Sequence, residues 1–184
     1  MKINDFFKSI VFLILSLYAQ PDSRFRPFDW VLYHGSGKIN SISEGYNFVY
    51  VGTEDGGIKR FNTFSLNFDD PITVAQGLKN NKIRAVHFDK ETGCLWAATP
   101  KFLNYSFSRE GNWFSVSLES LGLSRYEKIK KIGSSVGYIW LELNSTYVKL
   151  DHTNGSLIST YPRPDELSIN WSSGTEPLNN KVKK

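Results

Sequence analysis

The chain has 184 residues, of which 40% are hydrophobic, 22% charged and 15% aromatic, proportions that fit one globular domain and exclude a disordered or fibrous chain. The net charge is +4, but the basic residues are spread along the chain apart from a short cluster at 181–184, so no nucleic-acid partner is expected. The one cysteine, Cys94, rules out an internal disulfide framework. It lies in a strand-like apolar stretch, and we interpret it as a small buried hydrophobic residue.

The first residues have the features of a secretory signal peptide. Lys2 and Lys8 supply positive charge, residues 10–17 (IVFLILSL) form an apolar core, and Ala19 offers a cleavage site. We therefore predict a signal peptide at 1–19 and an exported location in the periplasm, at the cell surface or outside the cell. An uncleaved membrane anchor is the less favoured alternative, because a spanning helix needs about 20 apolar residues. We expect no membrane span after cleavage.

The remaining chain contains an internal repeat. Isoleucines that open a short strand are spaced 44 and 46 residues apart, and aromatic residues in a more continuously apolar strand are spaced 46 and 44 apart. The structural anchors of this repeat are Ile39, Tyr50, Gly52, Gly57, Ile83, Trp96, Ile129 and Trp140. A period of this length with several short strands per unit is typical of the four-stranded blades of a β-propeller. The sequence thus predicts an all-β, propeller-like fold.

Each repeat has the same order of predicted strands and turns. An alternating strand, a polar turn, an apolar strand, a tight hairpin, a third strand and an outer strand follow one another. The outer strand is clearest at 113–116 and 157–161, and residues 30–33 resemble an outer strand without inner ones. The predicted propeller spans 29–171, with blades near 39–82, 83–128 and 129–171.

Three blades are fewer than a closed ring needs. Residues 167–171 resemble the start of a fourth blade, but the chain then becomes polar, and we predict a disordered tail at 172–184. The alternatives are an incomplete ring, a ring assembled from copies, and a fragment of a longer protein; we favour a fragment or a degenerate partial propeller. Open blade edges would permit self-association.

Two of the blades carry a recognisable motif. The second has Gly77-Leu78-Lys79-Asn80 before its first strand and continues with Asp89 to Trp96, and the first supplies Val51-Gly52-Thr53 and Gly56 to Phe61. Over about residues 30–161 the repeat resembles the two-component regulator propeller repeat, a WD40/YVTN-like unit found in extracellular sensor regions of bacterial hybrid histidine kinases and in other exported bacterial proteins. The resemblance implies an exported propeller and does not by itself specify a function.

No group of residues points to catalysis or metal binding. The histidines, which are His34, His87 and His152, lie in no ligating spacing, and we interpret them as surface or strand-end residues. The acidic pairs at 54–55 and 69–70 are interpreted as turn residues rather than a calcium site. The repeated aromatic residues are assigned to the core rather than to carbohydrate stacking, because identical placement in each repeat indicates packing. We therefore predict no catalytic residue, cofactor or metal.

The sequence favours an exported, non-catalytic binding or interaction module whose partner is an unidentified protein or glycan ligand. Two alternatives remain open. One is a propeller enzyme that acts on glycans, which would need convergent acidic residues near the axis. The other is a structural subunit of an envelope or secretion assembly.

Overall fold

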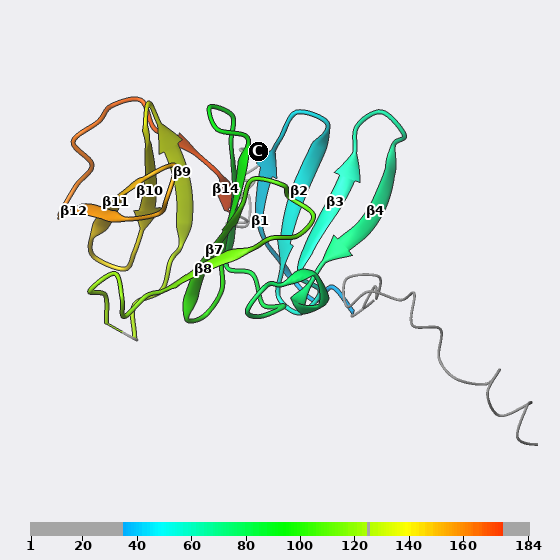
Figure 1. The fold of residues 1–184 in the computed structure, drawn as a ribbon, viewed down its shortest axis with the longest axis horizontal. Helices are drawn as coiled ribbons and strands as arrows, with labels where there is room; N and C mark the ends of the chain where they lie inside the picture. The colour runs from blue at the N-terminus through cyan, green and yellow to red at the C-terminus, as the bar shows by residue number, and fades with distance from the viewer. Residues whose placement is uncertain (1–34, 125, 175–184) are drawn as a thin grey trace, which may run out of the picture. The chain divides into compact units, whose positions relative to one another are not determined.

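The computed structural model describes residues 35–124 and 126–174. These residues form three antiparallel sheets and one short 3-10 helix, η1 (Val74–Gln76). The prediction of an all-β, propeller-like fold with about three four-stranded blades is confirmed (Figure 1). The predicted signal peptide at 1–19 and the outer strand at 30–33 lie outside the described residues. Among the residues that the structure describes, no helix has the length and hydropathy of a membrane span.

Each blade is a meander of four strands, and consecutive strands pair throughout. The first blade contains β1 (Ile39–Glu44), β2 (Phe48–Thr53), β3 (Ile58–Asn62) and β4 (Asn67–Ile72). The second contains β5 (Ala85–Asp89), β6 (Cys94–Ala98), β7 (Phe102–Ser106) and β8 (Phe114–Ser117). The third contains β9 (Lys131–Ser135), β10 (Tyr138–Glu142), β11 (Tyr147–Asp151) and β12 (Leu157–Tyr161).

The second blade is packed between the other two. Every residue of β6 is buried, because its side chains alternate between two apolar clusters. Leu95 and Ala97 join the cluster with the first blade, whereas Cys94, Trp96 and Ala98 join the cluster with the third. This two-sided burial explains why the strand is apolar without interruption.

The innermost strands β1 and β5 are joined through side chains. Ser41 and Ser43 of β1 reach the open edge of β5, where the Ser41 hydroxyl accepts from Val86 N at 3.2 Å and the Ser43 hydroxyl accepts from Phe88 N at 2.8 Å. Side-chain hydroxyls thus satisfy backbone groups that would otherwise be buried without a partner.

The edges of β1 and β9 are covered by the chain itself. Residues 162–174, which we call the return segment, contain β13 (Asn170–Trp171), paired with β9, and β14 (Ser173–Gly174), paired with β1. Between them the Ser172 hydroxyl donates to Ile132 O at 2.9 Å. The return segment therefore connects the inner edges of the first and third blades.

This segment corrects two expectations. Residues 167–171 do not begin a fourth blade, because Asn170 and Trp171 lie on the inner edge of the third blade. The predicted tail also begins too early, since residues 172–174 are hydrogen-bonded to β9 and β1. Strands of two residues are too short to show a periodicity in the sequence, so this pairing could not be predicted.

Two interpretations of polar residues also change. Asp69 and Asp70 lie in β4 rather than in a turn, and Asp69 is paired in register with Arg60. His87 is not a surface residue: it is 1% exposed in the middle of β5, and its Nε2 lies 2.9 Å from the Ser134 hydroxyl of β9. Burial lowers the pKa of His87 to about 4, so the ring is neutral at physiological pH.

Candidate anion-binding pocket

The repeat carries a basic residue at a fixed place. Each innermost strand is approached by a lysine and an isoleucine, in Lys38-Ile39, Lys82-Ile83 and Lys128-Ile129. The residue after the isoleucine is Asn40, Arg84 or Lys130. Because innermost strands of a propeller start around its axis, the repeat brings these positions to one end of the fold.

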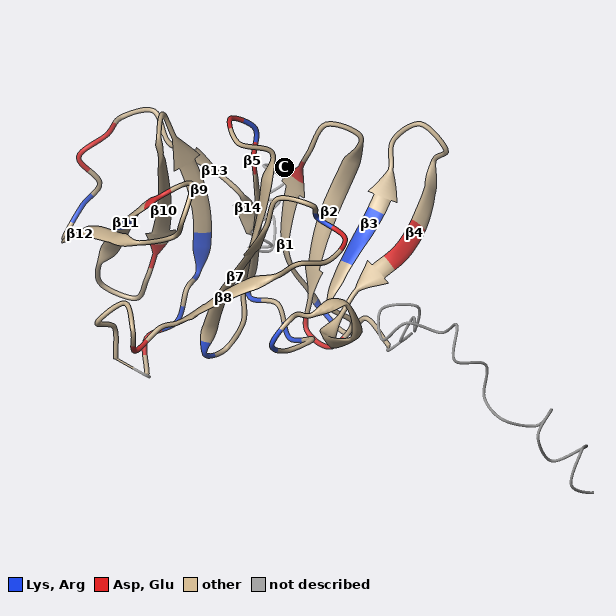
Figure 2. Cartoon of the chain, viewed as in Figure 1, with Lys and Arg blue, Asp and Glu red and all other residues tan. Residues whose placement is uncertain are grey.

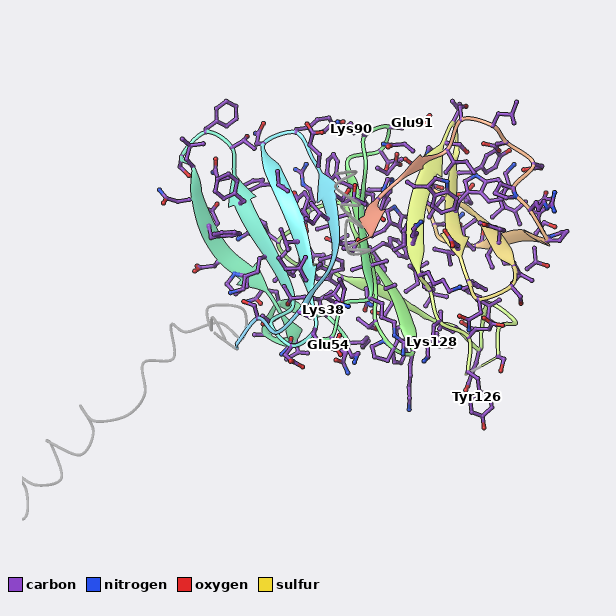
Figure 3. The ribbon with its side chains drawn as sticks, turned by 180° about the vertical axis from the view of Figure 1, so that it is seen from behind. Lys38, Glu54, Lys90, Glu91, Tyr126 and Lys128 are labelled. Carbon is purple, nitrogen blue, oxygen red and sulfur yellow. The ribbon has the colours of Figure 1, made fainter. Side chains whose placement is uncertain are left out.

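The structure has a pocket of about 600 Å³ at this end, which we call the axial pocket. It is lined by Lys38, Asn40, Glu54, Lys82, Arg84, Lys128, Ile129, Lys130, Lys131, Glu142 and Gly174. Basic segments lie along the lower end of the sheets in Figure 2, and Lys38, Glu54 and Lys128 share one end in Figure 3, opposite Lys90 and Glu91. Six basic side chains thus face two carboxylates.

One rim of the axial pocket is fixed by hydrogen bonds. The Glu54 carboxylate is ion-paired with Lys82 and accepts from Asn40 Nδ2 at 2.9 Å. Asn40 Nδ2 also donates to Ile83 O at 2.9 Å, which ties this rim to the second blade. Hydrogen bonds from Lys82 and Asn40 lower the pKa of Glu54, so this carboxyl stays ionised.

The other carboxylate of the axial pocket is also paired. Glu142 lies 3.7 Å from Lys131 Nζ. In contrast, the ammonium groups of Lys38 and Lys128 have no hydrogen-bond or ion-pair partner among residues 35–124 and 126–174. Arg84 Nη1 is buried and likewise without a hydrogen-bond partner in the described part of the chain. The pocket therefore has surplus positive charge that its own carboxylates do not neutralise.

This site was not predicted, because the basic residues look scattered along the sequence. The signal was present: a lysine stands directly before each of the isoleucines Ile39, Ile83 and Ile129. Of these anchors, Ile83 and Ile129 are 0% and 2% exposed, whereas Ile39 is 43% exposed. Repetition of a charged residue beside a core position means that one surface receives the same charge from every blade.

The other anchors serve packing. Tyr50, Trp96 and Trp140 are buried, at 3%, 0% and 0% exposure. A Cβ on Gly52 would lie 2.8 Å from Ile83 Cγ2, and a Cβ on Gly57, which has a φ of 74°, would collide with the carbonyl oxygen of Ile72. Glycine is needed at both places, for close blade approach and for the hairpin turn respectively.

Among the described residues, Cys94 and His152 show no arrangement typical of a reactive thiol or of a metal site. Burial raises the pKa of the Cys94 thiol to about 12, so this thiol is not ionised at neutral pH. His152 Nδ1 lies 3.4 Å from Asp89 Oδ2 and 3.8 Å from Glu91 Oε2. Within the described ranges, no three His, Cys, Asp or Glu side chains are grouped so as to hold a metal ion.

Known structures share this fold. The chain matches the extracellular domain of BT4673 from B. thetaiotaomicron, described in one structure as a putative one-component system and in another as a putative hybrid two-component system. Both matches have 14% identity and a TM-score of 0.56, and cover 76% and 77% of this chain but 18% of the other. This chain thus spans about a fifth of the length of those domains. No protein-family model and no curated protein matches the sequence.

Proposed function

We propose that the chain is an exported, non-catalytic binding module built from blades of the two-component regulator type, and that the axial pocket binds a multiply charged anion. The observation that carries the proposal is the lysine repeated before the innermost strand of all three blades, at Lys38, Lys82 and Lys128. The signal-like N-terminus and the description of the matched BT4673 domains as extracellular support export.

Several anionic groups suit the axial pocket better than one. Its six basic side chains outnumber its two carboxylates, and the rim made by Asn40, Glu54 and Lys82 is already ordered. Preformed positive charge lowers the cost of ordering side chains when a ligand binds. It also attracts anions over a distance that salt shortens, to about 8 Å at physiological ionic strength.

A glycan-acting enzyme is the alternative. Such an enzyme needs an acid and a base or nucleophile that are free to exchange protons with substrate. Glu54 and Glu142 are instead held in ion pairs with Lys82 and Lys131. This arrangement favours binding over hydrolysis, and a screen of glycan substrates that found turnover would reverse the assignment.

The test is titration calorimetry of the secreted protein with tripolyphosphate and with acetate. We expect tripolyphosphate to bind, to weaken steeply between about 50 and about 500 mM NaCl because of screening, and to bind at least tenfold more tightly than acetate. Lys128→Ala should weaken tripolyphosphate binding. The matched control is Lys90→Ala, which removes a lysine from the opposite end (Figure 3). Equal binding by both variants would refute the site.

A further inference from the structure

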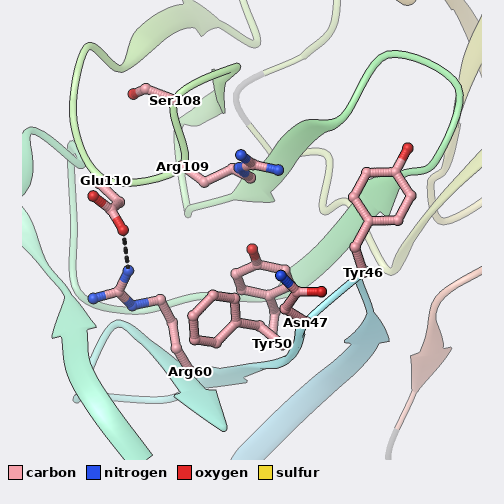
Figure 4. A pocket seen from close by; sticks show the side chains of 8 residues that line it. Tyr46, Asn47, Tyr50, Arg60, Ser108, Arg109 and Glu110 are labelled. Carbon is pink, nitrogen blue, oxygen red and sulfur yellow. Dashed lines mark hydrogen bonds and ion pairs between the residues drawn. The ribbon is translucent and has the colours of Figure 1, made fainter. Parts of the chain in front are cut away.

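A second pocket lies away from the axis, on the face of the first blade that is turned toward the second. Its volume is about 400 Å³, which is within the range of small-molecule sites. We call it the inter-blade pocket; it is lined by Tyr46, Asn47, Phe48, Tyr50, Arg60, Ser108, Arg109 and Glu110 (Figure 4). Residues 108–110 come from the loop between β7 and β8, so both blades contribute to this pocket.

One of the two arginines in the inter-blade pocket is held in place by protein groups. The Arg60 side chain is 13% exposed, its Nη1 lies 3.3 Å from Glu110 Oε1, and its Nε donates to Asp70 O at 2.9 Å. Its guanidinium carbon stands 5.7 Å from the centre of the Phe48 ring. Glu110 therefore balances the charge of Arg60, and the Phe48 ring lies within cation–π distance of its guanidinium.

The other arginine has no such partner. The Arg109 guanidinium makes no hydrogen bond or ion pair with any residue that the structure describes. Figure 4 shows it reaching from the loop across the pocket, with the Tyr50 hydroxyl pointing toward it. Burial raises the pKa of Tyr50 although the charge of Arg109 opposes that rise, so the phenol keeps its proton and can donate.

The loop that carries Arg109 is held by hydrogen bonds. Arg109 has a φ of 62°, in the left-handed region that non-glycine residues rarely occupy. The Ser106 hydroxyl holds this conformation by accepting from Arg109 N at 3.1 Å and donating to Gly111 O at 2.6 Å. Unusual backbone conformations of this kind are concentrated at sites where ligands are clamped. The protein thus fixes the base of a side chain whose charged end has no partner among the described residues.

We propose that the inter-blade pocket binds an aromatic monocarboxylate. A guanidinium presents a planar fork that matches a carboxylate with two hydrogen bonds. Two arginines and one carboxylate leave a single surplus positive charge, so one anionic group suffices. The rings of Tyr46 and Phe48 suit a flat apolar body, and the Tyr50 hydroxyl and Asn47 amide supply further polar contacts.

The test compares phenylacetate with phenylacetamide, which keeps the ring and removes the charge. The secreted protein is titrated with each and followed by amide NMR shifts. We expect phenylacetate to give saturable shifts at residues 107–112 and at Tyr50, and phenylacetamide to bind at least tenfold more weakly. Equal binding of the two probes, or shifts confined to the axial pocket, would overturn the proposal.

Two variants in the same loop make the test specific. Arg109→Gly removes the guanidinium and suits the positive φ, so the protein should keep its melting temperature while phenylacetate binding falls at least tenfold. Asn112→Gly relieves a φ of 50° outside the pocket lining and should bind phenylacetate within twofold of the parent. Unchanged binding by Arg109→Gly would also contradict the proposal. Tripolyphosphate binding by Arg109→Gly should stay unchanged, which separates this site from the axial pocket.

Discussion

Trp96 and Trp140 occupy the same position in successive blades, yet different chemistry buries them. Trp96 faces the third blade, stacks on Tyr105 with ring centres 4.6 Å apart, and belongs to an apolar cluster. Trp140 lies outside that cluster, and its Nε1 donates to the Ser135 hydroxyl at 3.0 Å. Lys149 Nζ stands 5.0 Å from the centre of the Trp140 ring.

An ion pair completes the cover of Trp140. Lys149 Nζ lies 2.6 Å from Glu166 Oε1 and 3.6 Å from Asp165 Oδ1, both in the return segment. Ile169 and Trp171 of the same segment pack on Gly133. A buried tryptophan of a blade can therefore be covered either by the next blade, as Trp96 is, or by ion pairs with a return segment, as Trp140 is.

The largest loss of stability is expected when Trp96 is removed from the apolar cluster between the second and third blades. Trp96→Ala should destabilise the protein by about 3–5 kcal/mol, because it removes a large side chain from a packed interface and leaves a cavity. Urea unfolding monitored by circular dichroism measures the change. The loss should be the same at about 50 and about 500 mM NaCl, since the Trp96 contact involves no charge; a strong salt dependence would contradict an apolar contact.

Gly52 and Gly133 test the contact between blades and the contact with the return segment, respectively. Gly52→Ala places a Cβ 2.8 Å from Ile83 Cγ2 between two blades and should cost about 1–3 kcal/mol through overpacking. Gly133→Ala places a Cβ 2.8 Å from Ile169 Cγ2 and 2.9 Å from Trp171 in the return segment. We expect the second change to speed hydrogen exchange at Ser172 N more than in the blade cores. If exchange became equally fast at Ser172 N and in the blade cores, the return segment would not unfold independently of the blades.

The ion pair beside Trp140 is tested by Glu166→Gln. This change leaves Lys149, whose side chain is 10% exposed, without its nearest carboxylate. We expect a loss of about 1–3 kcal/mol, the usual cost of a charged group that loses its partner. Asp165→Asn is the control, and it should cost about 0.5 kcal/mol or less because Asp165 is more distant and more exposed. A larger loss of stability in Asp165→Asn than in Glu166→Gln would mean that Asp165, and not Glu166, is the main partner of Lys149.

The same pair predicts a smaller effect of pH. Burial raises the pKa of Glu166, but hydrogen bonds from Lys149 and Ser135 outweigh it, and the net pKa is lowered. The pair therefore stabilises the protein above the ordinary carboxyl pKa of about 4.3, and this contribution is lost as the pH falls through the lower folded value. The stability difference between parent and Glu166→Gln should thus be constant from pH 6 to 8 and shrink toward pH 3. A constant difference down to pH 3 would contradict the pairing.

The sequence alone determined the blades. Repeated anchors such as Ile83 and Trp96 recur because each blade buries the same positions, and burial leaves a periodic pattern of residue type. The lysines before those isoleucines belong to the same pattern and could also have been found. The closure of the inner edges became visible only in the folded chain. The pairing of β13 and β14 joins residues far apart in the sequence through backbone groups that every residue type carries. The inter-blade pocket was equally hidden, since Arg60 and Arg109 meet there only after two blades have packed.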